Sequence, residues 1–305
     1  MYHFTRRKFL KSSSVLLAAS FVTTSSDVKK NKPLLAFSTL GCPDWDFKKI
    51  TNFAVQHNYT GIEVRGIQRQ LDLTKCNEFS SAENIKNTLA LMKDQGLRFV
   101  DLGSSAAMHI ADAAERKKNM DEARQFIDLA QKINCPYVRV FPNQIPKDKD
   151  KNETMDLIIK GLQELGEYAK GTNVTVLMET HGDLVKSEDI LNVMQSAEGD
   201  HTGLVWDITN MWSVTKEPPA EVYSKLKKYI RHTHIKDLKM VDDKEQYVFL
   251  GKGEAPIFAA IDVLEKDGYK GYYSFEWEKL WHPEIAEPEA ALANYSEVMK
   301  QHFNK

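Results

Sequence analysis

The chain has 305 residues, with 41 Lys and Arg against 43 Asp and Glu, which leaves a formal net charge of −2. This balance argues against a protein that binds nucleic acid through bulk electrostatics. Hydrophobic residues make up 42% of the chain, and Gly and Pro number only 15 and 10, so a globally disordered or low-complexity chain is excluded.

The chain starts with a pattern typical of export. Residues 5–11 read Thr-Arg-Arg-Lys-Phe-Leu-Lys, and an apolar run from Val15 to Val22 follows. That run is too short for a transmembrane helix, which needs about 20 apolar residues. A basic segment, a short apolar segment and a Ser/Thr stretch are the parts of a signal peptide, and the paired arginines resemble the Tat consensus. We expect a Tat-type signal peptide at residues 1–26, recognition by the Tat export machinery, and a periplasmic protein.

From residue 27 onward, apolar β-branched runs alternate with amphipathic stretches. We predict eight strands, at Leu34–Thr39, Gly61–Arg65, Arg98–Leu102, Tyr137–Phe141, Thr175–Glu179, Gly203–Asp207, Ile230–Ile235 and Tyr272–Glu276. We also predict eight helices, near Phe47–His57, Ala82–Gln95, Ala111–Ile133, Thr154–Lys170, Ser187–Ser196, Ala220–Leu226, Pro256–Asp267 and Pro288–Phe303. Glycines that follow three of these helices, Gly96, Gly171 and Gly268, are typical of helix C-termini.

Eight strand–helix units in succession predict an α/β fold, a single (β/α)₈ TIM barrel over residues 27–305. The main alternative is an open doubly wound sheet. It is disfavoured because Thr39–Pro43, after the first strand, lacks the G-x-G-x-x-G spacing. In a barrel, the carboxyl ends of the strands point into the active site, so functional side chains are expected there.

Four predicted strands carry acidic or imidazole groups toward their carboxyl ends. Glu179, Asp207 and Glu276 each end an apolar strand, where a lone buried charge is costly. His232 and His234 are two residues apart on one strand and share a face. Any one of these groups alone is more typical of a helix cap or an ion pair. Together, three carboxylates and one imidazole suit a divalent ion, with Mn²⁺ preferred and Mg²⁺, Co²⁺ or Zn²⁺ as alternatives.

Over about the whole chain after residue 26, the sequence resembles the xylose isomerase-like, or sugar phosphate isomerase/epimerase, TIM barrel superfamily. The resemblance is carried by Gly61–Arg65, Val138–Phe141, Met178–Gly182, Trp206–Asn210, His232–Asp237, Leu250–Gly253 and Phe275–Glu276. In the ketose 3-epimerase branch, the matching Glu, Asp, His and Glu bind one divalent metal, and the two Glu act as acid and base. The resemblance therefore implies that Glu179, Asp207, His234 and Glu276 bind the metal. It also implies that Glu179 and Glu276 transfer protons.

Further polar residues follow the strand ends, and each of them also suits ordinary packing or a solvent-facing loop. We predict substrate contacts for His181, Asn210, Lys236 and His109. Asn210 stands where many members of the superfamily have a His, and in the branch related to AP endonuclease IV that His binds a second metal. A multi-metal nuclease site is therefore disfavoured.

Two polar residues on the second strand have a simpler interpretation. We expect Glu63 and Arg65 to pair with each other inside the barrel as a structural feature. His232 is expected to pack low in the barrel, with a role in supporting a metal ligand as the alternative.

The metal site predicts an enzyme, and the resemblance implies that it acts on a sugar. A bound cation polarises a carbonyl, and a carboxylate removes the adjacent proton to give an enediolate. Proton return gives an epimerase or an isomerase, whereas expulsion of a β leaving group gives a lyase, for example of 3-keto-glycosides. Because export is expected, we favour a non-phosphorylated sugar or keto-sugar, with isomerase/epimerase activity first and the lyase as the alternative. A non-catalytic sugar-binding barrel and a nuclease-like hydrolase are less favoured. No nucleic-acid partner is expected, and a homo-oligomer is compatible with this fold.

Overall fold

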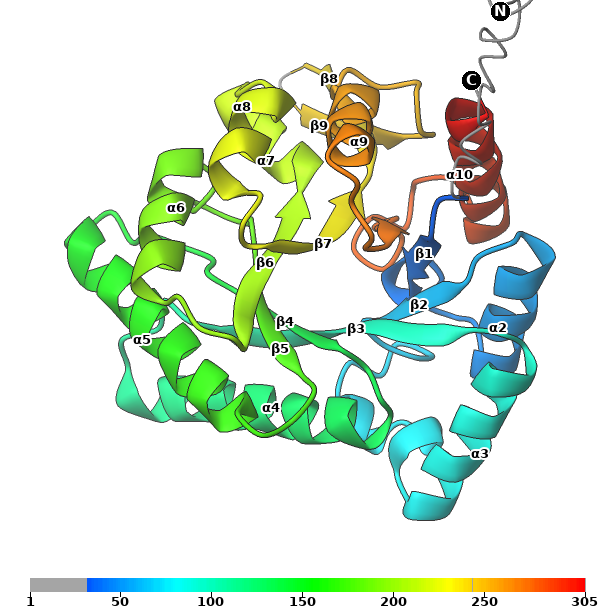
Figure 1. Ribbon diagram of the computed structural model, residues 1–305, viewed down its shortest axis with the longest axis horizontal. Coiled ribbons are helices and arrows are strands. Elements are labelled where there is room, and N and C mark those ends of the chain that lie inside the picture. The colour runs from blue at the N-terminus through cyan, green and yellow to red at the C-terminus, as the bar shows by residue number, and fades with distance from the viewer. Residues whose placement is uncertain (1–31, 243, 305) are drawn as a thin grey trace, which may run out of the picture. The chain divides into compact units, whose positions relative to one another are not determined.

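The computed structural model describes residues 32–242 and 244–304. Within them, eight parallel strands close into a barrel in the order β1-β10-β7-β6-β5-β4-β3-β2 (Figure 1). The barrel strands are β1 (Leu35–Ser38), β2 (Gly61–Val64), β3 (Arg98–Ala107), β4 (Tyr137–Phe141), β5 (Thr175–Glu179), β6 (Thr202–Asp207), β7 (Ile230–Ile235) and β10 (Tyr273–Phe275). The predicted (β/α)₈ TIM barrel is therefore confirmed. The predicted signal peptide at residues 1–26 lies outside the described residues.

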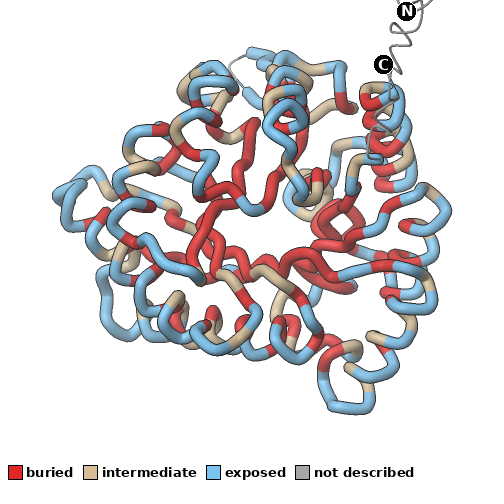
Figure 2. The backbone as a smooth tube through the Cα atoms, viewed as in Figure 1, coloured by how far each residue is buried: buried red, intermediate tan, exposed pale blue. Residues whose placement is uncertain are grey.

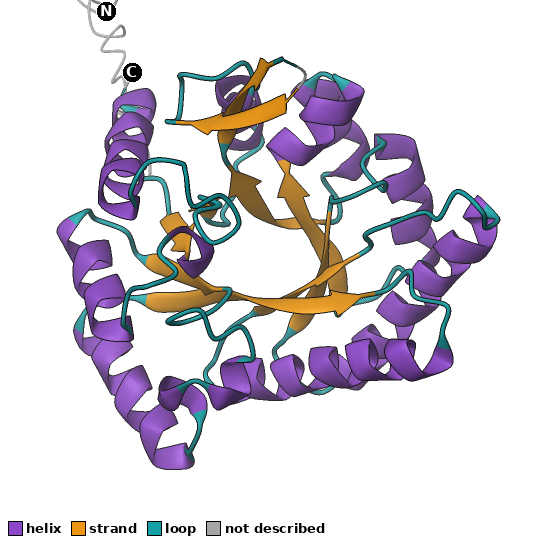
Figure 3. Ribbon diagram, turned by 180° about the vertical axis from the view of Figure 1, so that it is seen from behind, coloured by secondary structure: helices purple, strands orange, loops and turns teal. Residues whose placement is uncertain are grey.

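Helices surround the barrel on its outer face (Figure 3). They are α2 (Phe47–Gln56), α3 (Ala82–Asp94), α4 (Ala113–Lys132), α5 (Lys151–Ala169), α6 (Ser187–Ser196), α7 (Ile208–Thr215), α8 (Pro219–Leu226), α9 (Ile257–Lys266) and α10 (Pro288–Phe303). Gly96, Gly171 and Gly268 have positive φ angles just after α3, α5 and α9, as predicted for helix ends. None of the helices in the described part of the chain is both long and apolar enough to cross a membrane.

The core follows from burial on both faces of the strands. The whole of β2 and the whole of β6 are buried, which explains why the barrel strands read as continuous apolar runs. Each helix buries the stripe that faces the barrel; in α4 this stripe includes Ala123, Phe126, Ile127 and Ala130. Figure 2 shows the buried backbone at the centre and the exposed backbone on the outer helices.

Three elements differ from the sequence-based expectation. A hairpin of β8 (Asp237–Val241) and β9 (Lys244–Val248) follows β7; its mostly polar, exposed residues lack the alternation that predicts a strand. Helix α7 begins directly after β6, with no loop to mark its start. Strand β3 runs five residues further than predicted, through Gly103 to Ala107. The hairpin and α7 matter for the site because both begin at strand ends that carry candidate residues.

Candidate metal centre

The barrel brings together the four residues that the sequence indicates as metal ligands. Glu179 ends β5, Asp207 ends β6, His234 lies in β7, and Glu276 directly follows β10. All four are buried, and one ligand atom from each lies within 4.8 Å of the others. Their strands occupy successive positions in the barrel, β10-β7-β6-β5, so their carboxyl ends converge on one edge.

His234 lies at the centre of this group. Its Nδ1 atom is 3.3 Å from Glu276 Oε1, 3.7 Å from Glu179 Oε1 and 4.0 Å from Asp207 Oδ2. Burial lowers the pKa of His234, but Glu276, Glu63 and Glu179 outweigh burial and hold this pKa well above its ordinary value. Without a metal ion, the carboxylates therefore surround a positively charged imidazolium.

Arg139, in the middle of β4, supplies a second positive charge. Its Nε atom is 3.1 Å from Glu179 Oε2, close enough for an ion pair but without hydrogen-bond alignment. Its guanidinium also donates a hydrogen bond from Nη1 to the Ser104 carbonyl and stacks 3.8 Å from the ring centre of Phe141. Burial and Glu276 raise the pKa of Glu179, but Arg139 and His234 outweigh them and bring it below its ordinary value. Glu179 is therefore held as a carboxylate.

Lys236 supplies the third charge, from the residue after β7. Its buried Nζ atom lies 2.7 Å from Glu276 Oε2, 2.8 Å from Asp207 Oδ2 and 2.6 Å from Glu278 Oε1. Burial raises the pKa of Asp207 to about 7, and Lys236 offsets part of that rise. For Glu276, His234 and Lys236 outweigh the effect of burial and hold the pKa well below its ordinary value. Lys236 therefore contacts two of the candidate ligands.

The donor set fits a divalent cation. Glu276 Oε1 faces the centre of the cluster while its Oε2 faces Lys236, so one oxygen remains for a metal. Asp207 Oδ1 accepts a hydrogen bond from the Asn210 backbone N–H, which leaves Oδ2 toward the cluster. His234 Nδ1 is buried and has no hydrogen-bond partner, while Asp207 Oδ2 and Glu179 Oε2 have only the ion-pair contacts with Lys236 and Arg139. One ligand atom from each of the four residues lies within 4.8 Å of the others, so three carboxylates and one imidazole could hold a divalent cation.

Two of the four predicted substrate-binding residues contact the candidate ligands, and the other two do not among the described residues. Lys236 lies within the cluster, and the Asn210 side chain donates a long hydrogen bond of 3.4 Å to Glu179 Oε1. His181, half-buried after β5, packs against Phe141 with ring centres 4.6 Å apart. His109 is half-buried in the loop after β3. In the part of the chain that the structure describes, neither His181 nor His109 makes a hydrogen bond or ion pair with the four candidate ligands.

The prediction that Glu63 pairs with Arg65 is wrong, because both side chains have other partners among the described residues. Arg65 instead donates from Nη2 to Ser105 Oγ at 2.9 Å. Glu63 Oε2 accepts hydrogen bonds from His232 Nε2 and His234 Nε2, both at 3.0 Å. Strands β2 and β7 are not neighbours, so this contact crosses the barrel interior, which spacing along one strand does not reveal.

Sequence reasoning also gave no role to Arg139 and Glu278. Arg139 is a charged residue in the centre of an otherwise apolar strand, Tyr137–Phe141, and a charge at that position was the available signal. Glu278 lies two residues after Glu276, but the chain leaves the strand at Phe275, so strand periodicity does not place its side chain.

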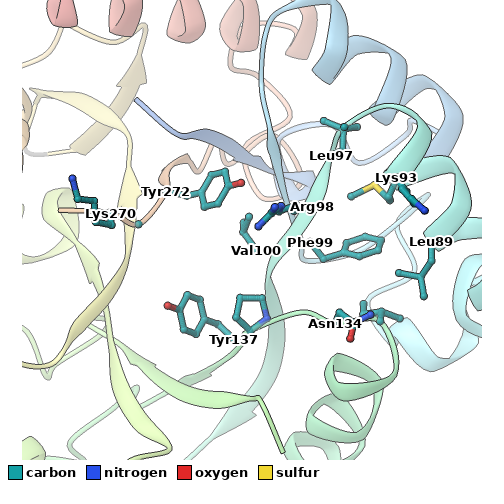
Figure 4. Close-up of a pocket in the computed structure, with 15 residues that line it drawn as sticks. Leu89, Lys93, Leu97, Arg98, Phe99, Val100, Asn134, Tyr137, Lys270 and Tyr272 are labelled. Atoms are coloured by element: carbon teal, nitrogen blue, oxygen red, sulfur yellow. The ribbon is translucent and has the colours of Figure 1, made fainter. Parts of the chain in front are cut away.

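A cavity of about 770 Å³ lies at the opposite end of the barrel (Figure 4). It is lined by residues at the starts of β3 and β4 and just before β10, among them Arg98, Tyr137 and Tyr272. It contains none of the candidate site residues. Because TIM barrels place their active sites at the carboxyl ends of the strands, this cavity is not the candidate active site.

Known proteins resemble this chain in sequence or in fold. A fructoselysine 3-epimerase from Shigella flexneri is 23% identical over 175 residues, which cover 55% of this chain and 62% of that epimerase. The structure of the probable 3-DHS dehydratase AsbF from Bacillus anthracis superposes with a TM-score of 0.73 at 17% identity, covering 87% of this chain and 98% of that one.

The structure of the IOLI protein, which carries a zinc atom, superposes with a TM-score of 0.74 at 16% identity, covering 89% of this chain and 98% of that one. Likeness at these identities shows the shared fold. The model of the xylose isomerase-like TIM barrel family matches residues 52–302. The chain therefore belongs to the xylose isomerase-like TIM barrel family.

Proposed function

We propose that this protein is a divalent-metal-dependent isomerase or epimerase of a non-phosphorylated sugar or keto-sugar. The observation that carries the proposal is the convergence of two carboxylates on one cation position. Glu276 Oε1 and Glu179 Oε1 lie 3.3 and 3.7 Å from His234 Nδ1. They come from strands that two other strands separate in the barrel, so they approach from different sides.

Glu179, Asp207, His234 and Glu276 would hold the metal ion, with Mn²⁺ as the preferred ion. The zinc atom in the IOLI structure supports a metal in this fold, although it does not fix the ion here. A divalent ion in this position would polarise a substrate carbonyl and make the neighbouring C–H more acidic.

The chain's own residues supply the proton transfers. One of Glu179 and Glu276 removes the proton next to the carbonyl, and the other returns a proton. The lowered pKa values hold both groups as carboxylates in the free protein, so either can accept the proton, and the group that returns a proton must first take one up. Return to the opposite face of the same carbon is epimerisation, and return to the neighbouring carbon is isomerisation. The 3-epimerase among the relatives supports this class of reaction.

A lyase reaction is the second candidate, and one observation favours it. Lys236 Nζ lies 2.7 Å from Glu276 Oε2, so an ammonium is held beside a candidate base. After Glu276 removes a proton, Lys236 could protonate a departing β substituent, as elimination from a 3-keto-glycoside requires. The dehydratase among the structural neighbours is consistent with this outcome.

The proposal includes export of the protein. The twin-arginine pattern at residues 5–11 supports a Tat-exported, periplasmic enzyme, and that location favours free or glycosidic sugars as substrates. Fusion of residues 1–31 to a folded reporter, with both arginines replaced by lysine as the control, tests this part. Equal export of the two fusions would refute the Tat assignment.

The reaction itself is tested by NMR in D₂O. The Mn²⁺-treated protein is incubated with a 3-keto-glucoside, and the exchanged product is examined after chelation of the metal. Deuterium beside the carbonyl without release of the aglycone supports the isomerase/epimerase proposal. Aglycone release instead supports the lyase. Neither exchange nor release, with this substrate and with a panel of simple ketoses, would refute both proposals.

A further inference from the structure

A second cluster of ligating side chains adjoins the candidate metal centre and shares His234 with it. Glu63, His232 and His234 present ligand atoms within 4.8 Å of one another, and all three side chains are fully buried. Glu63 Oε2 accepts from His232 Nε2 and His234 Nε2 at 3.0 Å each and from Ser274 Oγ at 2.9 Å. Three donors from two strands therefore converge on one carboxylate oxygen.

This arrangement is a hydrogen-bond cluster rather than a second metal site. A carboxylate oxygen has about two lone pairs, and three donors already share those of Glu63 Oε2. A metal ion between Glu63 and the two imidazoles would need both Nε2 atoms to lose their protons and Ser274 to turn away. The three hydrogen bonds leave no lone pair of Glu63 Oε2 free to bind a metal ion.

The two nitrogens of His234 face different groups. Nε2 faces Glu63, whereas Nδ1 faces Glu179, Asp207 and Glu276. An ionised carboxylate can only accept hydrogen bonds, so the nitrogen that faces Glu63 must carry a proton. Ser274 Oγ donates to the same oxygen, and three donors on one carboxylate oxygen match the ionised, acceptor-only form of Glu63.

The backbone also holds Glu63 in place. The pairing of β2 with β3 shifts register between Ile62 and Glu63, so that Ile62 faces Phe99 but Glu63 faces Asp101. Such irregularities change the direction of a side chain and recur beside active sites. His232 and Ser274, on β7 and β10, hold the same carboxylate oxygen from strands that do not neighbour β2.

We infer that Glu63 is a positioning residue, which keeps the proton of His234 on Nε2 and thereby assigns Nδ1 as the metal-binding atom. The inference rests on the proposed metal site. A histidine ligand whose other ring nitrogen donates to a carboxylate is held in both tautomer and orientation, and loss of such a partner typically weakens metal binding 10–100-fold.

The test compares E63Q with H232Q and needs no substrate. Gln at position 63 presents an N–H as well as an oxygen, so it no longer forces the proton of His234 onto Nε2. We expect Mn²⁺ binding by E63Q to weaken about 10–100-fold in calorimetry. H232Q is the matched control, because Gln at position 232 still offers an N–H to Glu63 and leaves its bond to His234 intact. We expect H232Q to keep the affinity of the unmodified protein.

A second readout uses the unmodified protein and remains decisive if E63Q does not fold. In the Zn²⁺-loaded, ¹⁵N-histidine-labelled protein, NMR should show His234 with a protonated Nε2 and a metal-bound Nδ1. A protonated Nδ1 would overturn the inference, as would E63Q with unchanged Mn²⁺ affinity or H232Q weakened as much as E63Q. An inactive enzyme with these binding results intact would refute the proposed function alone.

Discussion

Replacement of Asp101 by Asn should stabilise the metal-free protein at neutral pH. Asp101 lies in β3, is fully buried, and neither of its carboxylate oxygens has a hydrogen-bond partner in the structure. Burial, reinforced by the negative charge of Glu63, raises its pKa from 3.8 to about 8; Arg139 offsets part of this rise. The folded protein therefore keeps Asp101 protonated at pH 7, and Asn is close to that neutral form in shape.

The expected gain follows from linkage. Between pH 3.8 and about 8, the folded state holds a proton on Asp101 that the unfolded state releases, so this group makes the protein less stable as pH rises. Neutral pH lies about three units above the ordinary pKa, and each unit corresponds to about 1.4 kcal/mol. The gain for D101N at pH 7 is therefore on the order of 4 kcal/mol, an upper bound because the unfolded chain retains some structure.

The assay is urea unfolding followed by circular dichroism at pH 5, 6, 7 and 8, with EDTA present. The difference between D101N and the unmodified protein should grow steadily with pH across this range. D148N, at an exposed position in the loop before α5, is the matched control and should show no such trend. A constant difference between D101N and the unmodified protein would refute the assignment of a neutral Asp101.

Three further predictions concern the candidate metal centre. K236M removes a buried ammonium from three carboxylates and should lower the free energy of unfolding of the EDTA-treated protein by about 3–5 kcal/mol. An unchanged urea midpoint would contradict the ion-pair geometry. E179Q and E276Q should each reduce deuterium exchange into substrate about 10²–10⁴-fold and retain a native circular dichroism spectrum. The control is E198Q, because Glu198 is exposed and pairs with Lys228 and Tyr229; this variant should exchange deuterium at the normal rate. Mn²⁺ at about 100 times its Kd should stabilise the protein by about 2.7 kcal/mol over EDTA, and no rise in Tm would count against a metal site.

The elements that carry the site were predictable because they are periodic and apolar. β5 and β6 end at Glu179 and Asp207, as the sequence indicated, since a charged residue after a buried run marks the end of a parallel strand. The β8–β9 hairpin was not predictable, because exposed residues such as Lys239 and Glu245 carry no burial pattern. It lies at the site all the same: Tyr247 Oη donates to Glu278 Oε1, which in turn holds Lys236.

The amino-acid sequence alone determined the barrel and the four candidate ligands at its strand ends, because the strand patterns depend on residues close together in the chain. Only the tertiary structure decided what those ligands contact. Glu63 bonds to His234 across the barrel interior, 171 positions away in the chain, and Arg139 reaches Glu179 from the neighbouring strand. The physical reason is closure: bending eight strands into a ring brings side chains from distant strands into one buried interior, where each charge must find a partner.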